Sequence, residues 1–346
     1  TSDIGAYSFG IQVTTTADTV NSTDGVTSLR EAITLANTTP GNDAISFNLT
    51  GASAYTITLA SALPTIVNST SSVTGGTSGN LTITGLSASS LTISGNKGDF
   101  SIFTIATGGI LSIADVTVSG AQVTGNGGAF NNSGTLTVSN STLSNNSVFR
   151  DGGGITNGGT ATFFNSTISG NSASNGGGIV NSGTLTVNNS TLANNSAFST
   201  RGGAICNVGG ATLTVSHSTL SGNSAINGNG SGIYNSGTLN IANTIIANNI
   251  GYDYSTSSGS TVGTVNLILS GNPGNPTSAA NNIVSNGSFS WATTKSSGLN
   301  LGPLQDNGGP TFTMALGTGS SAIGTANATI SNTSPILGLD QRGFTR

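Results

Sequence analysis

Short runs of alternating apolar and polar residues fill the middle of the chain and recur about every 25 residues. Five copies of a G-T-L-T-V-x-N-S-T-L-like pattern occupy residues 134–147, 159–172, 183–196, 211–224 and 237–250. An alternation of period two predicts β-strands, and self-similarity at this fixed period predicts a solenoid. We therefore expect an all-β fold, a right-handed parallel β-helix (β-solenoid) in which each repeat forms one coil.

Alignment of the five copies places apolar residues in columns that face the interior of the coils. The first column is expected to hold Leu136, Ala161, Leu185, Leu213 and Leu239, the second Val138, Phe163, Val187, Val215 and Ile241, and the third Leu143, Ile168, Leu192, Leu220 and Ile246. Coils stack at the inter-strand spacing of about 4.8 Å, so the whole chain is expected to form about 14 coils.

Asparagine recurs in two further columns, and glycine clusters precede the copies. Stacked amides hydrogen-bond along a column, and asparagine also tolerates the left-handed backbone of sharp turns. We predict asparagine ladders at the bends, formed by Asn132, Asn157, Asn181, Asn207 and Asn235, and by Asn146, Asn171, Asn195, Asn223 and Asn249. The clusters at 152–154 and 176–178 are expected at a matching corner, where a positive φ costs glycine little.

The remaining segments fit a single β-solenoid domain over residues 1–346, with regular coils at 44–250 and irregular C-terminal coils at 251–346. Residues 27–37 are the exception, because Leu29, Ile33 and Ala36 recur with a helical period. Ser28 and Glu31 supply an S-x-x-E capping box at the start of this segment. Since a solenoid needs its open apolar end covered, the segment is predicted to be an N-terminal capping helix.

Charge is scarce along the chain: charged residues make up 5%, and the formal net charge is −4. With only 7 lysines and arginines, the chain has no basic patch for nucleic acid, which excludes that class of partner. No apolar run approaches the ~20 residues of a membrane helix, so membrane insertion is not expected. The single cysteine, Cys206, leaves no internal disulfide and no cysteine-rich metal site.

The few acids do not form a catalytic pattern in the repeat, where Asp151 is the one acid of the aligned block. Because fold alone does not imply activity, we predict that the chain is not an enzyme and uses no cofactor or metal ion. Asp18, Asn21 and Asp24 carry oxygens that suit calcium, but their spacing matches no calcium loop and favours turn and capping roles.

Isolated polar residues of the repeat are interpreted as surface groups. Arg150 and Arg201 precede glycine clusters and are expected to be solvated charges at corners, with a glycan contact as the alternative. His217 stands where other copies carry asparagine, so it is expected at an outward position. Cys206 belongs to a variable column and is likewise expected to face outward without a chemical role.

Three segments together resemble a known family. They are Ser28-Leu29-Arg30-Glu31-Ala32-Ile33, the stretch Leu304-Gln305-Asp306-Asn307-Gly308-Gly309-Pro310-Thr311, and Asp340-Gln341-Arg342-Gly343-Phe344. With the Gly/Asn repeats, the chain resembles bacterial surface β-helix proteins that have a C-S-L-R-E-A-type N-terminal motif and a choice-of-anchor-type C-terminal region, among polymorphic outer-membrane and adhesin-like repeats. Thr27 stands where that family usually has cysteine. The resemblance implies an extracellular or cell-surface location in a bacterium.

In that family a D-I-G-A-[YF]-E segment closes the domain, whereas here a similar segment lies at residues 2–9. Relative to the family the unit is permuted, which predicts that residues 1–10 pack against the C-terminal region of a preceding unit. The candidate self-assembly residues are Asp3, Ile4, Gly5, Ala6, Tyr7, Phe9, Asp340, Arg342 and Phe344. The expected partners are other copies of the chain, arranged head-to-tail, with surface glycans as a further class.

The leading hypothesis is a structural or adhesive extracellular module that self-associates into a fibre or tandem array. A carbohydrate-binding or carbohydrate-cleaving β-helix is the first alternative, because parallel β-helices host such enzymes. The second alternative is an ice-binding solenoid. It rests on outward T-x-T pairs at Thr135/Thr137, Thr160/Thr162, Thr184/Thr186 and Thr212/Thr214, although outward threonine is also simply a good strand residue.

Overall fold

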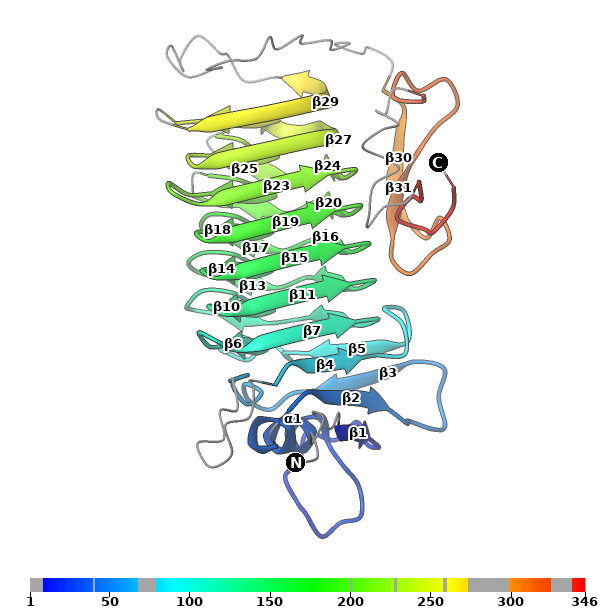
Figure 1. Ribbon diagram of the computed structural model, residues 1–346. Coiled ribbons are helices and arrows are strands. Elements are labelled where there is room, and N and C mark those ends of the chain that lie inside the picture. The colour runs from blue at the N-terminus through cyan, green and yellow to red at the C-terminus, as the bar shows by residue number, and fades with distance from the viewer. Residues whose placement is uncertain are drawn as a thin grey trace, which may run out of the picture.

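The structure is a computed structural model that describes residues 9–39, 41–67, 79–199, 201–226, 229–257, 260–272, 299–324 and 338–345. It confirms the predicted right-handed parallel β-helix. The coils stack along one axis, with helix α1 (Leu29–Thr38) across the N-terminal end and a C-terminal hairpin beside the stack (Figure 1). Within the described part of the chain, α1 is the one helix.

Each regular coil contributes four strands, and each strand pairs in parallel with its counterparts in the coils before and after it. The first strand of each coil belongs to a seven-stranded sheet of β6 (Phe103–Ile105), β10 (Phe130–Asn132), β14 (Ile155–Asn157), β18 (Ile179–Asn181), β22 (Ile205–Asn207), β26 (Ile233–Asn235) and β28 (Tyr254–Thr256). The second stack holds β7 (Ile110–Ala114), β11 (Thr135–Ser139), β15 (Thr160–Phe164), β19 (Thr184–Asn188), β23 (Thr212–Ser216) and the start of β27 (Thr238–Tyr252).

Two stacks of shorter strands complete the coils. The third contains β8 (Thr117–Ser119), β12 (Thr142–Ser144), β16 (Thr167–Ser169), β20 (Thr191–Ala193) and β24 (Thr219–Ser221), and the fourth β9 (Gln122–Val123), β13 (Ser147–Val148), β17 (Ser172–Ala173), β21 (Ser196–Ala197) and β25 (Ser224–Ala225). The first turns use β1 (Phe9–Val13), β2 (Asp43–Phe47), β3 (Tyr55–Thr58), β4 (Leu81–Thr84) and β5 (Leu91–Ser94). The last described coil adds β29 (Thr261–Asn272), which pairs with β27.

The pairing register confirms the three predicted interior columns. Leu136 pairs with Ala161, Val138 with Phe163, and Leu143 with Ile168, and the same alignment continues through the coil that contains β27. Every residue of the three columns is at most 3% exposed. The interior is therefore a continuous stack of aliphatic layers, each of which is buried by the coil above and the coil below.

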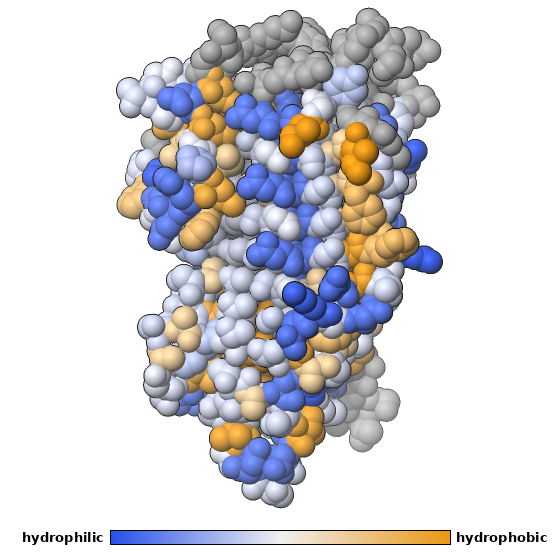
Figure 2. All heavy atoms as spheres, turned by 180° about the vertical axis from the view of Figure 1, so that it is seen from behind, coloured by the Kyte–Doolittle hydropathy of each residue, from blue (hydrophilic) through white to orange (hydrophobic). Residues whose placement is uncertain are grey.

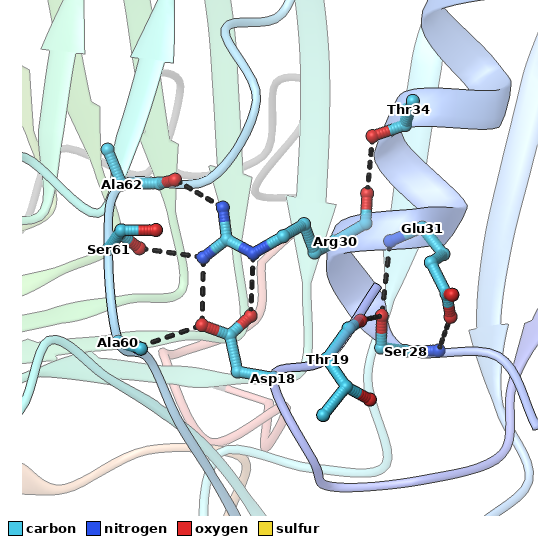
Figure 3. A network of polar contacts seen from close by, with 9 residues as sticks. All are labelled: Asp18, Thr19, Ser28, Arg30, Glu31, Thr34, Ala60, Ser61 and Ala62. Carbon is cyan, nitrogen blue, oxygen red and sulfur yellow. Dashed lines mark hydrogen bonds and ion pairs between the residues drawn. The ribbon is translucent and has the colours of Figure 1, made fainter. Parts of the chain in front are cut away.

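The N-terminal cap depends on one arginine as well as on apolar burial. Leu29, Ala32, Ile33 and Ala36 of α1 are buried against the first coil, and Ser28 with Glu31 forms the predicted capping box. Arg30 donates to both carboxylate oxygens of Asp18, at 2.8 and 2.9 Å, and to the backbone oxygens of residues 61 and 62 (Figure 3). One buried side chain thereby joins the helix, the loop before it and the chain after β3.

Ladder formation and left-handed backbone turn out to belong to different residues. Between residues 134 and 250, the residues other than glycine with positive φ are the corner asparagines Asn140, Asn165, Asn189 and Asn243, with His217 in the same register, together with Asn145, Asn194 and Asn248. None of the ten predicted ladder asparagines has a positive φ. The ladders and the left-handed corners are therefore formed by different asparagines, because a side chain that points inward to stack occupies the residue next to the bend.

The predicted C-terminal coils are present at the start of residues 251–346, where β28 and β29 pair with the preceding coil, but the described residues from 299 onward do not continue them. In place of irregular coils, residues 299–324 contain an antiparallel hairpin of β30 (Leu301–Gln305) and β31 (Thr313–Leu316), which lies beside the solenoid (Figure 1). The expected number of about 14 coils is also too high. The difference arises because the N-terminal turns carry the cap and long loops, and because this hairpin packs on the side of the rod.

The glycine corner offers a stability test. A Cβ built on Gly177 would lie 2.4 Å from the backbone oxygen of Ser196 in the next coil, whereas one on Gly158 would meet nothing closer than 3.6 Å. We expect Gly177→Ala to lower the free energy of unfolding by about 3 kcal/mol or more, because the coils would have to separate. Gly158→Ala, at an exposed turn, should change it by about 0.5 kcal/mol at most. Urea unfolding followed by circular dichroism measures both values, and equal losses would contradict the interpretation.

Candidate functional site

Both predicted sets of asparagines form buried ladders along the solenoid axis. In the first, the side-chain amide of Asn132 donates to Asn157 Oδ1 at 2.7 Å, and the same contact continues through Asn181 and Asn207 to Asn235. The first four of these amides also donate to a backbone oxygen in the next coil, as Asn157 does to Thr184. All five side chains are at most 1% exposed, so their role is to satisfy polar groups inside the bend.

The second ladder runs in the same direction and ends on a carboxylate. Asn146, Asn171, Asn195, Asn223 and Asn249 are linked by amide contacts of 2.9–3.0 Å. Asn249 then donates its side-chain amide to Asp253 Oδ1 at 2.8 Å. Asp253 is fully buried, and its second oxygen, Oδ2, has no hydrogen-bond partner. Burial raises the pKa of Asp253 to about 6, although the hydrogen bonds from Asn249 act in the opposite direction.

Sequence reasoning missed a third ladder, formed by serines. The backbone N–H of Ser141 donates to Ser166 Oγ, that of Ser166 to Ser190 Oγ, and that of Ser190 to Ser218 Oγ, at 3.1–3.3 Å. These four serines are at most 2% exposed. The sequence pattern that could have predicted this ladder is the repeated N-S-T triplet. Its asparagine forms the left-handed corner, and its serine points inward.

The outward threonines form a flat, uncharged face on the second strand stack. Thr135, Thr160, Thr184, Thr212 and Thr238 pair in register, and Thr137, Thr162, Thr186 and Thr214 form a parallel row two residues along the strands. These side chains are exposed or half-buried. Neighbours lie about 4.8 Å apart between coils and about 6.7 Å apart along a strand. We call these nine residues the threonine face; its strands run across the front of the stack in Figure 1.

Three candidate self-assembly residues at the C-terminal end make contacts within their own chain. Asp340 and Arg342 form an ion pair, and the Arg342 guanidinium lies 5.1 Å from the ring centroid of Phe344, whose side chain is 56% exposed. Asp340 and Arg342 are therefore paired with each other within one chain. Among the N-terminal candidates, Phe9 begins β1 and pairs with Asp43 of the first coil. The candidates at positions 3–7 lie outside the described residues.

The two C-terminal motifs meet at a buried glutamine that sequence reasoning did not select. Gln341 donates to Thr311 Oγ1 at 2.8 Å and to the backbone oxygen of Ser166 at 3.1 Å. Its side-chain oxygen accepts from Thr191 Oγ1 at 2.8 Å. Gln341 is 8% exposed, so it holds the C-terminal segment on the outer side of β16 and β20. The two motifs thus form one structural unit with the coils.

Two outward residues prove to be covered. Cys206 is 3% exposed, because the turn at Gly202 lies against the backbone of its strand, and burial raises the pKa of its thiol to about 12. His217 is 8% exposed and its Nε2 lies 2.9 Å from the amide nitrogen of Asn243. Their outward positions are therefore not solvent-exposed, since stacked neighbours and folded-back turns cover outward positions as well as inward ones.

The residues considered for calcium have other partners. Both carboxylate oxygens of Asp18 bind Arg30, and the side chains of Asn21 and Asp24 accept hydrogen bonds from the backbone two residues further along. Across the described ranges, no three His, Cys, Asp or Glu side chains are grouped as metal ligands would be. No helix in the described part of the chain is long and apolar enough to cross a membrane.

The buried carboxyl group of Asp253 predicts a pH-dependent stability. Because its pKa is raised on folding, the folded state binds the proton more tightly, and stability falls as the pH rises from about 4 to about 6. We expect Asp253→Asn to remove this loss, which is on the order of 3 kcal/mol, because an amide cannot ionise. Urea titrations between pH 4 and pH 8 measure it. The control Asp306→Asn, at an exposed turn, should keep the wild-type pH dependence; an unchanged dependence in Asp253→Asn would contradict the prediction.

Comparison with family models, with curated proteins and with solved structures found no match to this chain. The resemblance carried by residues 28–33, 304–311 and 340–344 therefore stays a prediction. What the structure adds is a physical role for those residues, which close the N-terminal end and fix the C-terminal segment.

Proposed function

We propose that the chain is a structural and adhesive module of an extracellular bacterial surface assembly, in which rods associate head-to-tail. The observation that carries the proposal is the closed, repetitive rod: its polar bends are satisfied internally by ladders, and its long threonine face is uncharged. Such a body suits close packing against neighbours, because few charges have to be desolvated in a contact. The location rests on the resemblance of the N-terminal motif.

The N-terminal end supports contact between closed rods. Helix α1 covers the first coil, so a neighbouring rod would meet a capped surface instead of extending the strands. Three apolar side chains are exposed on α1 and the loop before it: Val20 at 72%, Leu35 at 44% and Val26 at 40%. Burying side chains of this size stabilises a contact by about 1.5–3 kcal/mol each, which favours this end as the surface for the preceding rod.

Sedimentation velocity over a concentration series tests the head-to-tail contact. We expect the wild-type mass to grow with concentration, and the double variant Val20→Asp/Leu35→Asp to stay monomeric, because two charges would be buried in the contact. Ile226→Asp, which places a charge on the side of the rod, should assemble like the wild type. A wild type that is monomeric throughout, or three proteins that assemble equally, would rule out this contact.

The threonine face favours ice binding as a second candidate function. Nine threonines in two rows present hydroxyl and methyl groups at regular spacings in two directions. A surface that binds ice needs such regular spacings, because the water molecules of ice are themselves regularly spaced. The first row extends over five consecutive coils and the second over four, without a charged residue. This regularity is the specific observation that separates ice binding from a general adhesive role.

Thermal hysteresis measurements test the second candidate. If the face binds ice, the wild type should lower the freezing point below the melting point, and Thr162→Lys/Thr186→Lys should lose most of the effect because two long charged side chains break the flat face. Ser119→Lys on β8, outside the threonine face, should retain it. The absence of hysteresis in the wild type would eliminate ice binding and leave the structural role untouched.

A further inference from the structure

A column of exposed apolar side chains follows one edge of the solenoid, where the fold itself does not require them. Phe149 is 72% exposed, Ile226 70% and Phe198 39%. Each follows the last residue of a strand in the fourth stack, and their backbone N–H groups donate to the preceding coil in the same way. We call these three residues the Phe149 ridge. In the rear view, hydrophobic surface follows the right-hand edge of the molecule (Figure 2).

The repeat shows that phenylalanine is not needed at this position. Ser174 occupies the equivalent place in the coil between those of Phe149 and Phe198. The two rings nevertheless lie close across it, with centroids 6.5 Å apart and a tilt of 47°. Exposed aromatic rings add nothing to the interior columns, so the ridge is better explained by a ligand than by folding.

Two cationic side chains flank the ridge. Arg150 and Arg201 are both exposed, and the guanidinium of Arg201 lies 5.0 Å from the ring centroid of Tyr234, which holds it over the surface. Across the described ranges, ion pairs join Arg30 with Asp18 and Arg342 with Asp340, so neither flanking arginine is neutralised in this way.

The local charge indicates the sign of the partner. Asp151 is the nearest acid in sequence, and one of its oxygens accepts the Asn175 amide. Asp99 accepts hydrogen bonds from Thr124, which lies one coil below Phe149, so two aspartates stand near the two arginines and the ridge has no excess of positive charge. Both aspartates already accept hydrogen bonds, whereas neither arginine takes part in an ion pair among the described residues. An anionic partner with an apolar face would therefore match this surface.

We propose that the Phe149 ridge binds an acidic polysaccharide whose chain runs along the solenoid axis. The apolar C–H faces of its sugar rings lie on Phe149 and Phe198, and its carboxylates pair with Arg150 and Arg201. Arginine binds carboxylates through two parallel hydrogen bonds, and aromatic rings contribute large apolar contact areas. The arginines lie two coils apart, about 10 Å along the axis, so a linear polymer with regularly spaced charges fits the repeat.

A sugar chain fits this ridge better than an acidic peptide. The backbone N–H groups of Phe149, Phe198 and Ile226 already donate to Val123, Ala173 and Ala197. A peptide strand would therefore find no free donors there for strand addition, which is how an extended peptide gains affinity at a sheet. Stacking of sugar rings needs only exposed aromatic side chains, and Phe149 and Phe198 are 72% and 39% exposed.

This inference rests on the adhesive part of the proposed function, for which it names a ligand class and a surface. The head-to-tail contact and ligand binding at the ridge can be disproved independently. The first is tested with Val20 and Leu35 at the N-terminal end, whereas the ridge lies on the side of the coils.

Binding of the full chain to polygalacturonate, measured by isothermal titration calorimetry, tests the proposal. Its fully methyl-esterified form provides a neutral polymer of the same backbone. The double variant Phe149→Ser/Phe198→Ser uses the residue that the chain itself has at position 174, so the coil should fold normally. We expect the wild type to bind polygalacturonate and the ester at least tenfold more weakly. The double variant and Arg201→Gln should each lose at least tenfold, and affinity should fall as salt is added.

Several outcomes would overturn the proposal. The first is a wild type that binds neither polygalacturonate nor chondroitin sulfate, and the second is a double variant that binds as the wild type does. Equal affinity for poly-glutamate, retained in the double variant, would indicate charge attraction without a ring-stacking site. A wild type that dimerises, with the dimer lost in Phe149→Ser/Phe198→Ser, would assign the ridge to a second copy of the chain instead. Leu316→Ser, on the hairpin, is the matched control and should bind normally.

Discussion

Hydrogen bonding between successive coils constrains every other feature of this molecule, because each bend buries polar side chains. Asn195 shows the requirement: its oxygen accepts the backbone and side-chain N–H groups of Asn171, and its amide donates to Ile168 and Asn223. Removing that amide would leave groups in both neighbouring coils unsatisfied, at a cost of about 1–3 kcal/mol for each group. The bends are therefore restricted to a few residue types, whereas the outward positions of the strands are not.

A ladder in which every amide points the same way has two different ends. At the C-terminal end the last donor needs a group that only has to accept, and the Asp253 carboxyl supplies it at the cost of burying an ionisable side chain. The apolar end of the rod is covered separately by α1, which Arg30 fixes through Asp18 and two backbone oxygens. The other end of the ladder lies inside the rod, where Asn146 Oδ1 accepts the backbone N–H of Ala121 in the preceding coil. The chemistry of the two ends thus follows from the direction of stacking.

The features that could be predicted from the sequence are those that repeat. Leu136 and its equivalents follow a period-two pattern, and the columns of asparagine show a ladder without any knowledge of the coordinates. The serine ladder escaped prediction because N-S-T has the composition of a surface turn, and only the backbone shows that Ser166 points inward. The site of Gln341 could not be found either, since its contact with Thr167 joins residues 174 positions apart and no periodicity links them.

Scarcity of charge makes the remaining charges more significant. Where an ordinary surface mixes many ions of both signs, the field of one arginine is largely cancelled by its neighbours. Here charged residues are 5% of the chain, and two described arginines are neutralised by aspartates at the cap and the C-terminal segment. The field beside Phe149 and Phe198 therefore comes mainly from Arg150, Arg201, Asp151 and Asp99. A surface that is otherwise uncharged can distinguish an anionic ligand from a neutral one with only this small set of groups.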